Sequence, residues 1–123
     1  MKKMYLTLPL FALIVACGGG NEKKEATAEV VDLSSNPDYQ KGLELIGKSD
    51  CLTCHKVSDK NIGPAYKDVA AKYENTEENV KMLAGKIIKG GQGVWGAIPM
   101  TPHSSLSEAD AEQMVKYILL LKK

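Results

Sequence analysis

After residue 36, apolar residues recur at the spacing of three and four positions that is typical of one face of an α-helix. Asn36, Thr76 and Ser107 stand where a polar side chain would cap a first turn, and Gly90 stands where glycine commonly ends a helix. No alternating apolar run is long enough to indicate a strand. An all-α chain is therefore predicted, with helices over residues 36–48, 64–73, 76–91 and 107–123.

The three later helices each carry an apolar stripe that should face a common core. The stripes comprise Tyr66, Val69, Ala70 and Tyr73; then Val80, Leu83, Ala84, Ile87 and Ile88; then Ala111, Met114, Val115, Ile118 and Leu119. In the first helix Gly42 costs about 1 kcal/mol relative to alanine. Either another helix, offering Tyr117 or Ile118, approaches it closely, or it lies on a solvated face.

The N-terminus is typical of an export signal. Lys2 and Lys3 precede an apolar stretch, residues 4–16, which is shorter than the ~20 residues that a membrane span needs. The stretch ends in IVAC, which resembles the bacterial lipobox, so Cys17 is predicted to be acylated; an ordinary secretory signal is the alternative. The predicted organisation is a removed signal peptide (1–16), a lipidated flexible tether (17–35) and one domain (36–123).

The charge balance argues against a nucleic-acid partner. The chain has 16 basic and 15 acidic residues, and every basic residue is a lysine. Removal of Lys2 and Lys3 with the signal would leave 14 minus 15, a side-chain charge of −1. Phosphate recognition usually employs the planar arginine fork, which this chain lacks.

The segment DCLTCHKVSDKNIGPAY places Cys51, Cys54 and His55 within five positions. Such a group can form a disulfide, a dithiol redox centre, a zinc site or a covalent haem site. A disulfide leaves His55 without a role, a thioredoxin-like centre calls for neighbouring strands, and zinc needs a fourth ligand. The Cys-x-x-Cys-His run is the recognised signal for haem attachment, in which both thiols bind the porphyrin and His55 binds iron.

A six-coordinate haem needs a second axial ligand from elsewhere in the chain. Met100 is the candidate, because it lies in the loop GVWGAIPMTPH, where no helical periodicity would bury it. Pro99 and Pro102 restrict the backbone around it, so little further entropy is lost on ligation. By contrast, Met114 lies on a core stripe and Met82 lies off its stripe.

With these residues the chain resembles the small bacterial class I monohaem cytochromes c, short electron carriers of respiratory chains. The resemblance runs from about residue 37 to the C-terminus and is close in the blocks CLTCHKV, IGPAYKDVAAKY and GQGVWGAIPM. The pentapeptide alone is widely shared, whereas the glycine-proline pair and the tryptophan-containing loop are more specific. The resemblance implies a small class I cytochrome c fold, with about four short helices around one covalent haem c.

The resemblance also implies roles for residues around the haem. The Pro64 carbonyl would bind the outer nitrogen of His55, and Gly63 would let the backbone pass close to the haem. Trp95 and Lys86 would lie near a haem propionate, although Lys86 could equally be a solvated charge. His103 departs from the family pattern, which commonly has asparagine three positions after the methionine. A histidine there could couple protonation to reduction, because imidazole titrates near neutral pH.

The expected function is one-electron transfer between respiratory proteins, without enzymatic activity, because two protein ligands leave iron no open position. The partners would be redox proteins that dock briefly, and the protein would be a monomer, lipid-anchored to a bacterial membrane and facing the periplasm or the outer surface. Alternatives are a ligand-sensing or peroxidatic haem protein in which Met100 is displaced, and a structural lipoprotein with a disulfide. Four lysines could form a docking rim or serve solubility only: Lys48, Lys56, Lys60 and Lys67.

Overall fold

The computed structural model describes residues 32–122. The elements are η1 (Leu33–Ser35), α1 (Pro37–Lys48), α2 (Cys51–Cys54), α3 (Tyr66–Lys72), α4 (Glu77–Lys89), β1 (Gly91–Gly93), β2 (Gly96–Met100) and α5 (Glu108–Leu120). The predicted signal peptide, Cys17 and the tether up to residue 31 lie outside the described residues. Between residues 32 and 122, no helix has the length and hydropathy that crossing a bilayer requires.

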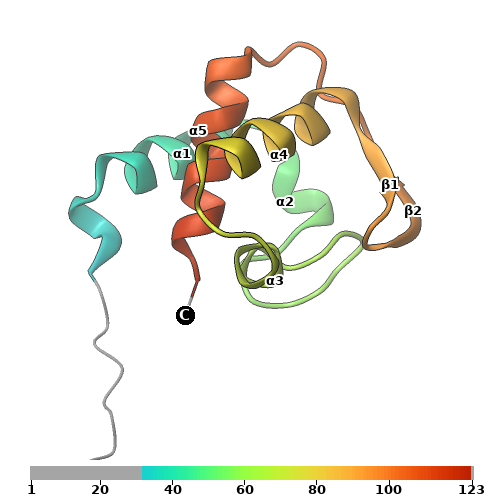
Figure 1. The fold of residues 1–123 in the computed structure, drawn as a ribbon, viewed down its shortest axis with the longest axis horizontal. Helices are drawn as coiled ribbons and strands as arrows, with labels where there is room; N and C mark the ends of the chain where they lie inside the picture. Colours follow the sequence, from blue (N-terminus) through green and yellow to red (C-terminus); the bar gives the residue numbers. More distant parts are fainter. Residues whose placement is uncertain (1–31, 123) are drawn as a thin grey trace, which may run out of the picture. The chain divides into compact units, whose positions relative to one another are not determined.

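Helix α5 is the centre of the fold and packs against α1, α3 and α4 (Figure 1). Two buried clusters meet on it. One joins α5 to α1 and α3 through Ile46, Tyr66, Met114, Tyr117 and Ile118. The other joins α5 to α4 through Val80, Ala84, Ala111, Val115 and Leu119. The predicted apolar stripes therefore do face a common core, and α5 is buried on both sides because it carries both clusters.

The crossing of α1 and α5 depends on Gly42. A Cβ atom at this position would lie 2.4 Å from Tyr117 Cβ and 2.6 Å from the Gln113 carbonyl oxygen. These separations are too short for any side chain larger than hydrogen. The predicted approach of Tyr117 to Gly42 is confirmed, and the close helix contact offsets the helix-propensity cost of glycine.

The predicted helix starts are largely confirmed by their capping contacts. The Asn36 side chain accepts hydrogen bonds from the first turn of α1, Thr76 Oγ1 accepts from Asn79 N in α4, and Ser107 Oγ accepts from Asp110 N in α5. Gly90 ends α4 with φ of 76°, a left-handed conformation that favours glycine. Helix α3 begins at residue 66, not at 64, because the backbone of Ala65 is extended.

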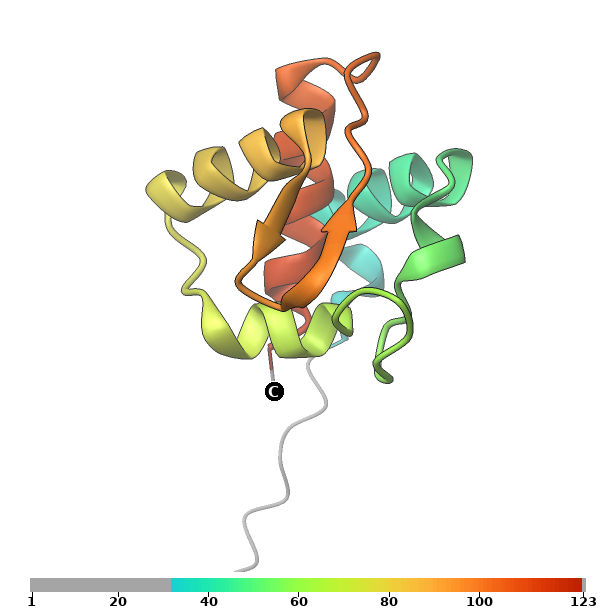
Figure 2. The ribbon, with the colours of Figure 1, turned by 90° about the vertical axis from the view of Figure 1, so that its right-hand side faces the viewer.

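Four short elements were not predicted: the strands β1 and β2, the helix α2 and the helix η1. Strands β1 and β2 form an antiparallel hairpin, with Gly91 paired to Met100 and Gly93 to Gly96 (Figure 2). The expectation of no strand was wrong because this hairpin is mostly solvent-exposed, so its sequence does not alternate between apolar and polar residues. Helix α2 is a fifth helix of one turn, too short for periodicity to reveal. In addition, residues 33–35, which we assigned to the tether, form the short helix η1.

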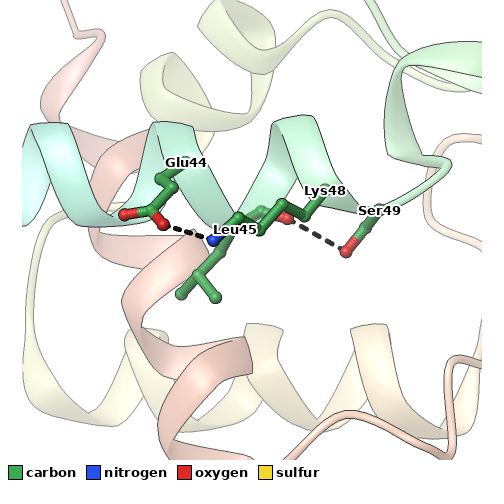
Figure 3. A network of polar contacts seen from close by, with 4 residues as sticks. All are labelled: Glu44, Leu45, Lys48 and Ser49. Atoms are coloured by element: carbon green, nitrogen blue, oxygen red, sulfur yellow. Dashed lines mark hydrogen bonds and ion pairs between the residues drawn. The ribbon is translucent and has the colours of Figure 1, made fainter.

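The end of α1 is fixed by polar contacts just ahead of the cysteine motif (Figure 3). Ser49 Oγ donates a hydrogen bond to the Leu45 carbonyl oxygen at 3.0 Å, which satisfies one of the unpaired carbonyls at the helix terminus. Lys48 forms an ion pair with Glu44 one turn earlier. The chain therefore leaves α1 in a defined direction and enters α2 two residues later.

Candidate functional site

A cavity of about 450 Å³ lies between α2, α4, α5 and the β1–β2 hairpin. This volume is within the range of small-molecule and cofactor sites. The structure brings together on its walls every predicted site residue that it describes: Cys51, Cys54, His55, Gly63, Pro64, Lys86, Trp95, Met100 and His103. These residues come from four separate parts of the sequence, so the fold itself assembles the site.

The imidazole of His55 is held in one orientation by its neighbours. Its Nδ1 donates a hydrogen bond to the Pro64 carbonyl oxygen at 2.8 Å, which places the proton on Nδ1 and leaves Nε2 with a free electron pair. The ring of Tyr66 stacks on it, with centroids 5.5 Å apart and planes 19° from parallel. An imidazole fixed in this way is prepared to bind a metal through Nε2.

Gly63 is required by His55. A Cβ at residue 63 would lie 2.4 Å from His55 Cε1 and less than 3 Å from both ring nitrogens. The neighbour that the structure shows for Gly63 is the imidazole, and the expected passage of this backbone close to a haem stays a prediction. Two backbone hydrogen bonds close this loop, from Gly63 N to Cys54 O at 2.8 Å and from Tyr66 N to Lys56 O at 2.9 Å.

Cys51 and Cys54 lie at the two ends of the single turn of α2, and both thiols are free and half-buried. Burial, with a smaller contribution from the charge of Asp50, raises the pKa of the Cys51 thiol. A reactive dithiol centre needs the opposite shift, since the thiolate is the nucleophile. In residues 32–122 no group of three or more His, Cys, Asp or Glu side chains could hold a metal ion. Both findings disfavour the dithiol and zinc interpretations of the motif.

Met100 lines the cavity from the hairpin, at the end of β2. Its backbone is placed by pairing with Gly91 and by contact with the end of α4, because a Cβ on Gly90 would lie 2.5 Å from the Met100 carbonyl oxygen. The ring of Pro102 packs at the same point, 3.2 Å from that position. Glycine at 90 and proline at 102 thus let the methionine segment run tightly over the helix end.

Large apolar side chains on this cavity are exposed in the protein alone. They are Ile62, Met82, Val94, Trp95 and Ile98, with Ile98 66% exposed. Such a gathering of exposed apolar surface marks a place where another group binds. A flat apolar macrocycle fits these walls, the two thiols, the free Nε2 of His55 and the thioether of Met100. The residues present therefore suit a covalently attached haem.

The remaining predicted residues also have defined neighbours. Trp95 lies at the hairpin turn, with Lys72 Nζ 5.6 Å from its ring centroid. The alkyl chain of Lys86 lies beside Gly91 of β1. His103 Nε2 is 2.9 Å from Asp50 Oδ1, while its Nδ1 is buried without a hydrogen-bond partner within residues 32–122.

Three neighbours of the predicted site residues were not assigned to the site from the sequence, namely Asp50, Tyr66 and Lys72. Tyr66 was predicted as a core residue only, although its place two positions after Pro64 could have indicated that it lies near His55. Asp50 directly precedes Cys51, which offered a similar signal. No pattern in the sequence pointed to Lys72, because its contact with Trp95 spans 23 residues.

Comparison with known proteins supports the haem interpretation. Residues 39–122 match the family model described as Cytochrome c. The chain is 47% identical over 83 residues to cytochrome c-552 of Nitrosomonas europaea, covering 68% of this chain and 81% of that protein. It is 42% identical over 83 residues to cytochrome c-551 of Allochromatium vinosum, covering 68% of this chain and 88% of that protein.

A solved structure agrees with the fold. The crystal structure of wild-type Nitrosomonas europaea cytochrome c552 aligns with a TM-score of 0.61 at 48% identity, over 65% of this chain and 99% of that chain. The mostly helical arrangement around the cavity is thus the fold of a cytochrome c, whose cofactor is one covalently attached haem c with its iron. On the family match, the sequence identities and the shared fold together, this chain belongs to the cytochrome c family.

Proposed function

We propose that this protein is a lipid-anchored one-electron carrier whose haem is attached through Cys51 and Cys54 and whose iron is bound by His55 and Met100. Cytochromes c transfer electrons to redox partners, and membership of that family is the starting point. The observation that carries the residue assignment is the arrangement of one cavity. A fixed imidazole and two thiols line one wall, and a methionine lines the other.

The two proposed iron ligands differ in how firmly the protein holds their side chains. His55 needs no reorientation, because Pro64 and Tyr66 already fix its ring with Nε2 free. Met100 is placed by its backbone, and its flexible thioether can adjust to the iron. When bound, haem iron supplies one-electron chemistry, and two protein ligands leave it no position for a substrate. This supports electron transfer over catalysis.

The exposed apolar wall supports brief contact with partner proteins. Val94, Trp95 and Ile98 lie at the hairpin and form exposed apolar surface at the rim of the cavity that would hold the haem. Among the four candidate rim lysines, Lys60 lines the cavity and is exposed, whereas Lys48 is paired with Glu44. We therefore assign the docking charge to Lys60 first. Rim charges of this kind mainly raise the association rate.

The anchoring part of the proposal rests on the N-terminal sequence. Cys17 follows an apolar stretch and a small residue, and a chain carrying two or more acyl groups would stay on the membrane. A Cys17→Ser variant should move from the membrane fraction to the soluble fraction while keeping its haem. Retention of that variant in the membrane fraction would contradict lipid anchoring without affecting the haem assignment.

The test of the haem ligands is a visible spectrum of the purified protein in both oxidation states, with and without Met100→Ala. The wild type should be low-spin, with a sulfur-to-iron charge-transfer band when ferric, and Met100→Ala should lose that band. Met82→Ala is the matched control, because Met82 lines the same cavity and is exposed. It should keep the band.

Two other results would favour the competing functions. A high-spin wild type that readily binds carbon monoxide would indicate a ligand sensor or a peroxidatic protein. A protein that shows no haem stain on a denaturing gel would indicate that the cysteines serve another purpose, since only a covalently attached cofactor survives the detergent.

A further inference from the structure

One side-chain contact joins the two halves of the proposed haem site. His103 Nε2 lies 2.9 Å from Asp50 Oδ1, although the residues are 53 positions apart. Asp50 directly precedes Cys51, and His103 follows Met100 by three positions. Among the side-chain hydrogen bonds of residues 32–122, this is the only one that connects the methionine segment (residues 100–103) to the cysteine segment (residues 50–55).

The Asp50 side chain contacts His103 and does not cap its own helix. It occupies the N-cap position of α2, where an aspartate usually accepts a hydrogen bond from the first turn, yet its side chain makes no capping bond. Its carboxylate is turned to His103 instead. Because Asp50 is 79% exposed, the pair lies at the edge of the cavity and is not part of the core.

His103 is anchored on the opposite side. Its backbone N–H donates to the Ile87 carbonyl oxygen at 3.0 Å, which fixes it to α4, and its side chain is only 20% exposed. Nδ1 is buried and has no hydrogen-bond partner within residues 32–122, so Nε2 makes the ring's only hydrogen bond there. The ring thus connects α4 and the methionine segment to the N-terminus of α2.

We infer that Asp50 and His103 form a latch that holds the Met100 segment against the haem-attaching helix and thereby resists displacement of Met100 from iron. Both are positioning residues, acting through the backbone between residues 100 and 103. The inference rests on the proposed function, in that it assumes Met100 is the ligand. Such a latch would make the iron selective, because an iron that keeps its methionine excludes small external ligands.

Imidazole titration of the ferric holoprotein tests the latch, with loss of the sulfur-to-iron charge-transfer band as the readout. Asp50→Ala and His103→Ala should each lower the imidazole concentration for half displacement by about two- to tenfold, the range for one lost hydrogen bond. The double variant should show no more than the larger single effect, because the two residues act as a unit. Asp50→Asn keeps an acceptor oxygen and should remain closer to wild type.

Glu74→Ala is the matched control, because Glu74 forms another long-range surface pair, with Lys122, away from the cavity lining. It should leave the titration unchanged. Unaltered titrations in both alanine variants, additive effects in the double variant or an equal shift in Glu74→Ala would each overturn the latch while leaving Met100 as the ligand. A wild type without the charge-transfer band would overturn the ligand assignment and the latch with it.

Discussion

The two walls of the haem cavity are built very differently. The attachment wall, residues 51–66, is tied by backbone hydrogen bonds, by the bond from His55 to Pro64 and by stacking on the buried ring of Tyr66. The hairpin wall, residues 91–100, is exposed along most of its length and is held mainly by its own pairing and by contact with the end of α4. One proposed ligand is therefore fixed before haem binds, and the other depends on a thin segment.

The two walls should therefore differ in how they tolerate substitution. The His55 side is continuous with the core, so a change there alters folding and ligation together. The Met100 side has little packing of its own, so changes there should alter ligation and docking with small effects on folding.

The largest expected contrast uses one substitution at two places. Ile46 is 1% exposed and packs with Tyr66 and Cys51 behind the attachment wall, whereas Ile98 is 66% exposed on the hairpin. In the holoprotein, Ile46→Ala should reduce the free energy of unfolding by about 2–5 kcal/mol, from lost burial and a cavity. Ile98→Ala should cost less, because Ile98 belongs to neither buried side-chain cluster and its truncation leaves no cavity in the protein core. Denaturant unfolding measures the free energy of unfolding of both variants, and equal losses would contradict the proposed difference between the two walls.

The second prediction tests how tightly the attachment wall fits His55. Gly63→Ala should cost about 1–3 kcal/mol, because the new methyl group would overlap the imidazole. Gly47→Ala is the control: Gly47 is an exposed helical glycine whose added Cβ would meet nothing within 4 Å. It should stabilise the protein by about 0.4–1 kcal/mol. Thermal unfolding of the two variants should therefore shift in opposite directions, and a neutral Gly63→Ala would show that the ring has room.

The difference between local and long-range contacts explains which features could be predicted from the sequence. Helix starts at Asn36, Thr76 and Ser107 were predictable, because capping is a local interaction between neighbouring residues. The hairpin was missed because an exposed two-stranded ribbon has no buried face to impose alternation. The Asp50–His103 contact was missed because it joins residues 53 positions apart, and nothing local in either segment specifies it.

The third prediction uses the buried tyrosine behind His55. Burial raises the pKa of the Tyr66 hydroxyl, so the folded state holds this proton more tightly than the unfolded state. The resulting stability is fully present below the unfolded pKa of about 10, and it is lost as pH rises from there through the higher pKa of the folded state. Above pH 10 the free energy of unfolding should fall by up to about 1.4 kcal/mol per pH unit from this group. Tyr66→Phe should show a shallower decline, and parallel curves would contradict this origin.

The smallest expected effect concerns docking at the cavity rim. Lys60→Gln should lower the second-order rate of electron exchange with an acidic redox partner by about two- to fivefold at low salt, because a rim charge steers association. Lys48→Gln is the control, since Lys48 already pairs with Glu44. Stopped-flow rates should converge at high ionic strength, where exposed charges are screened. Equal slowing by both variants would contradict the assignment of the docking charge to Lys60.

The most direct test of the central claim, that iron is bound by one residue from each wall, is X-ray absorption at the iron edge of the holoprotein. The account predicts a single sulfur scatterer at bonding distance in the wild type and in Met82→Ala, and its loss in Met100→Ala. A wild-type iron without sulfur, or a sulfur that persists in Met100→Ala, would contradict it.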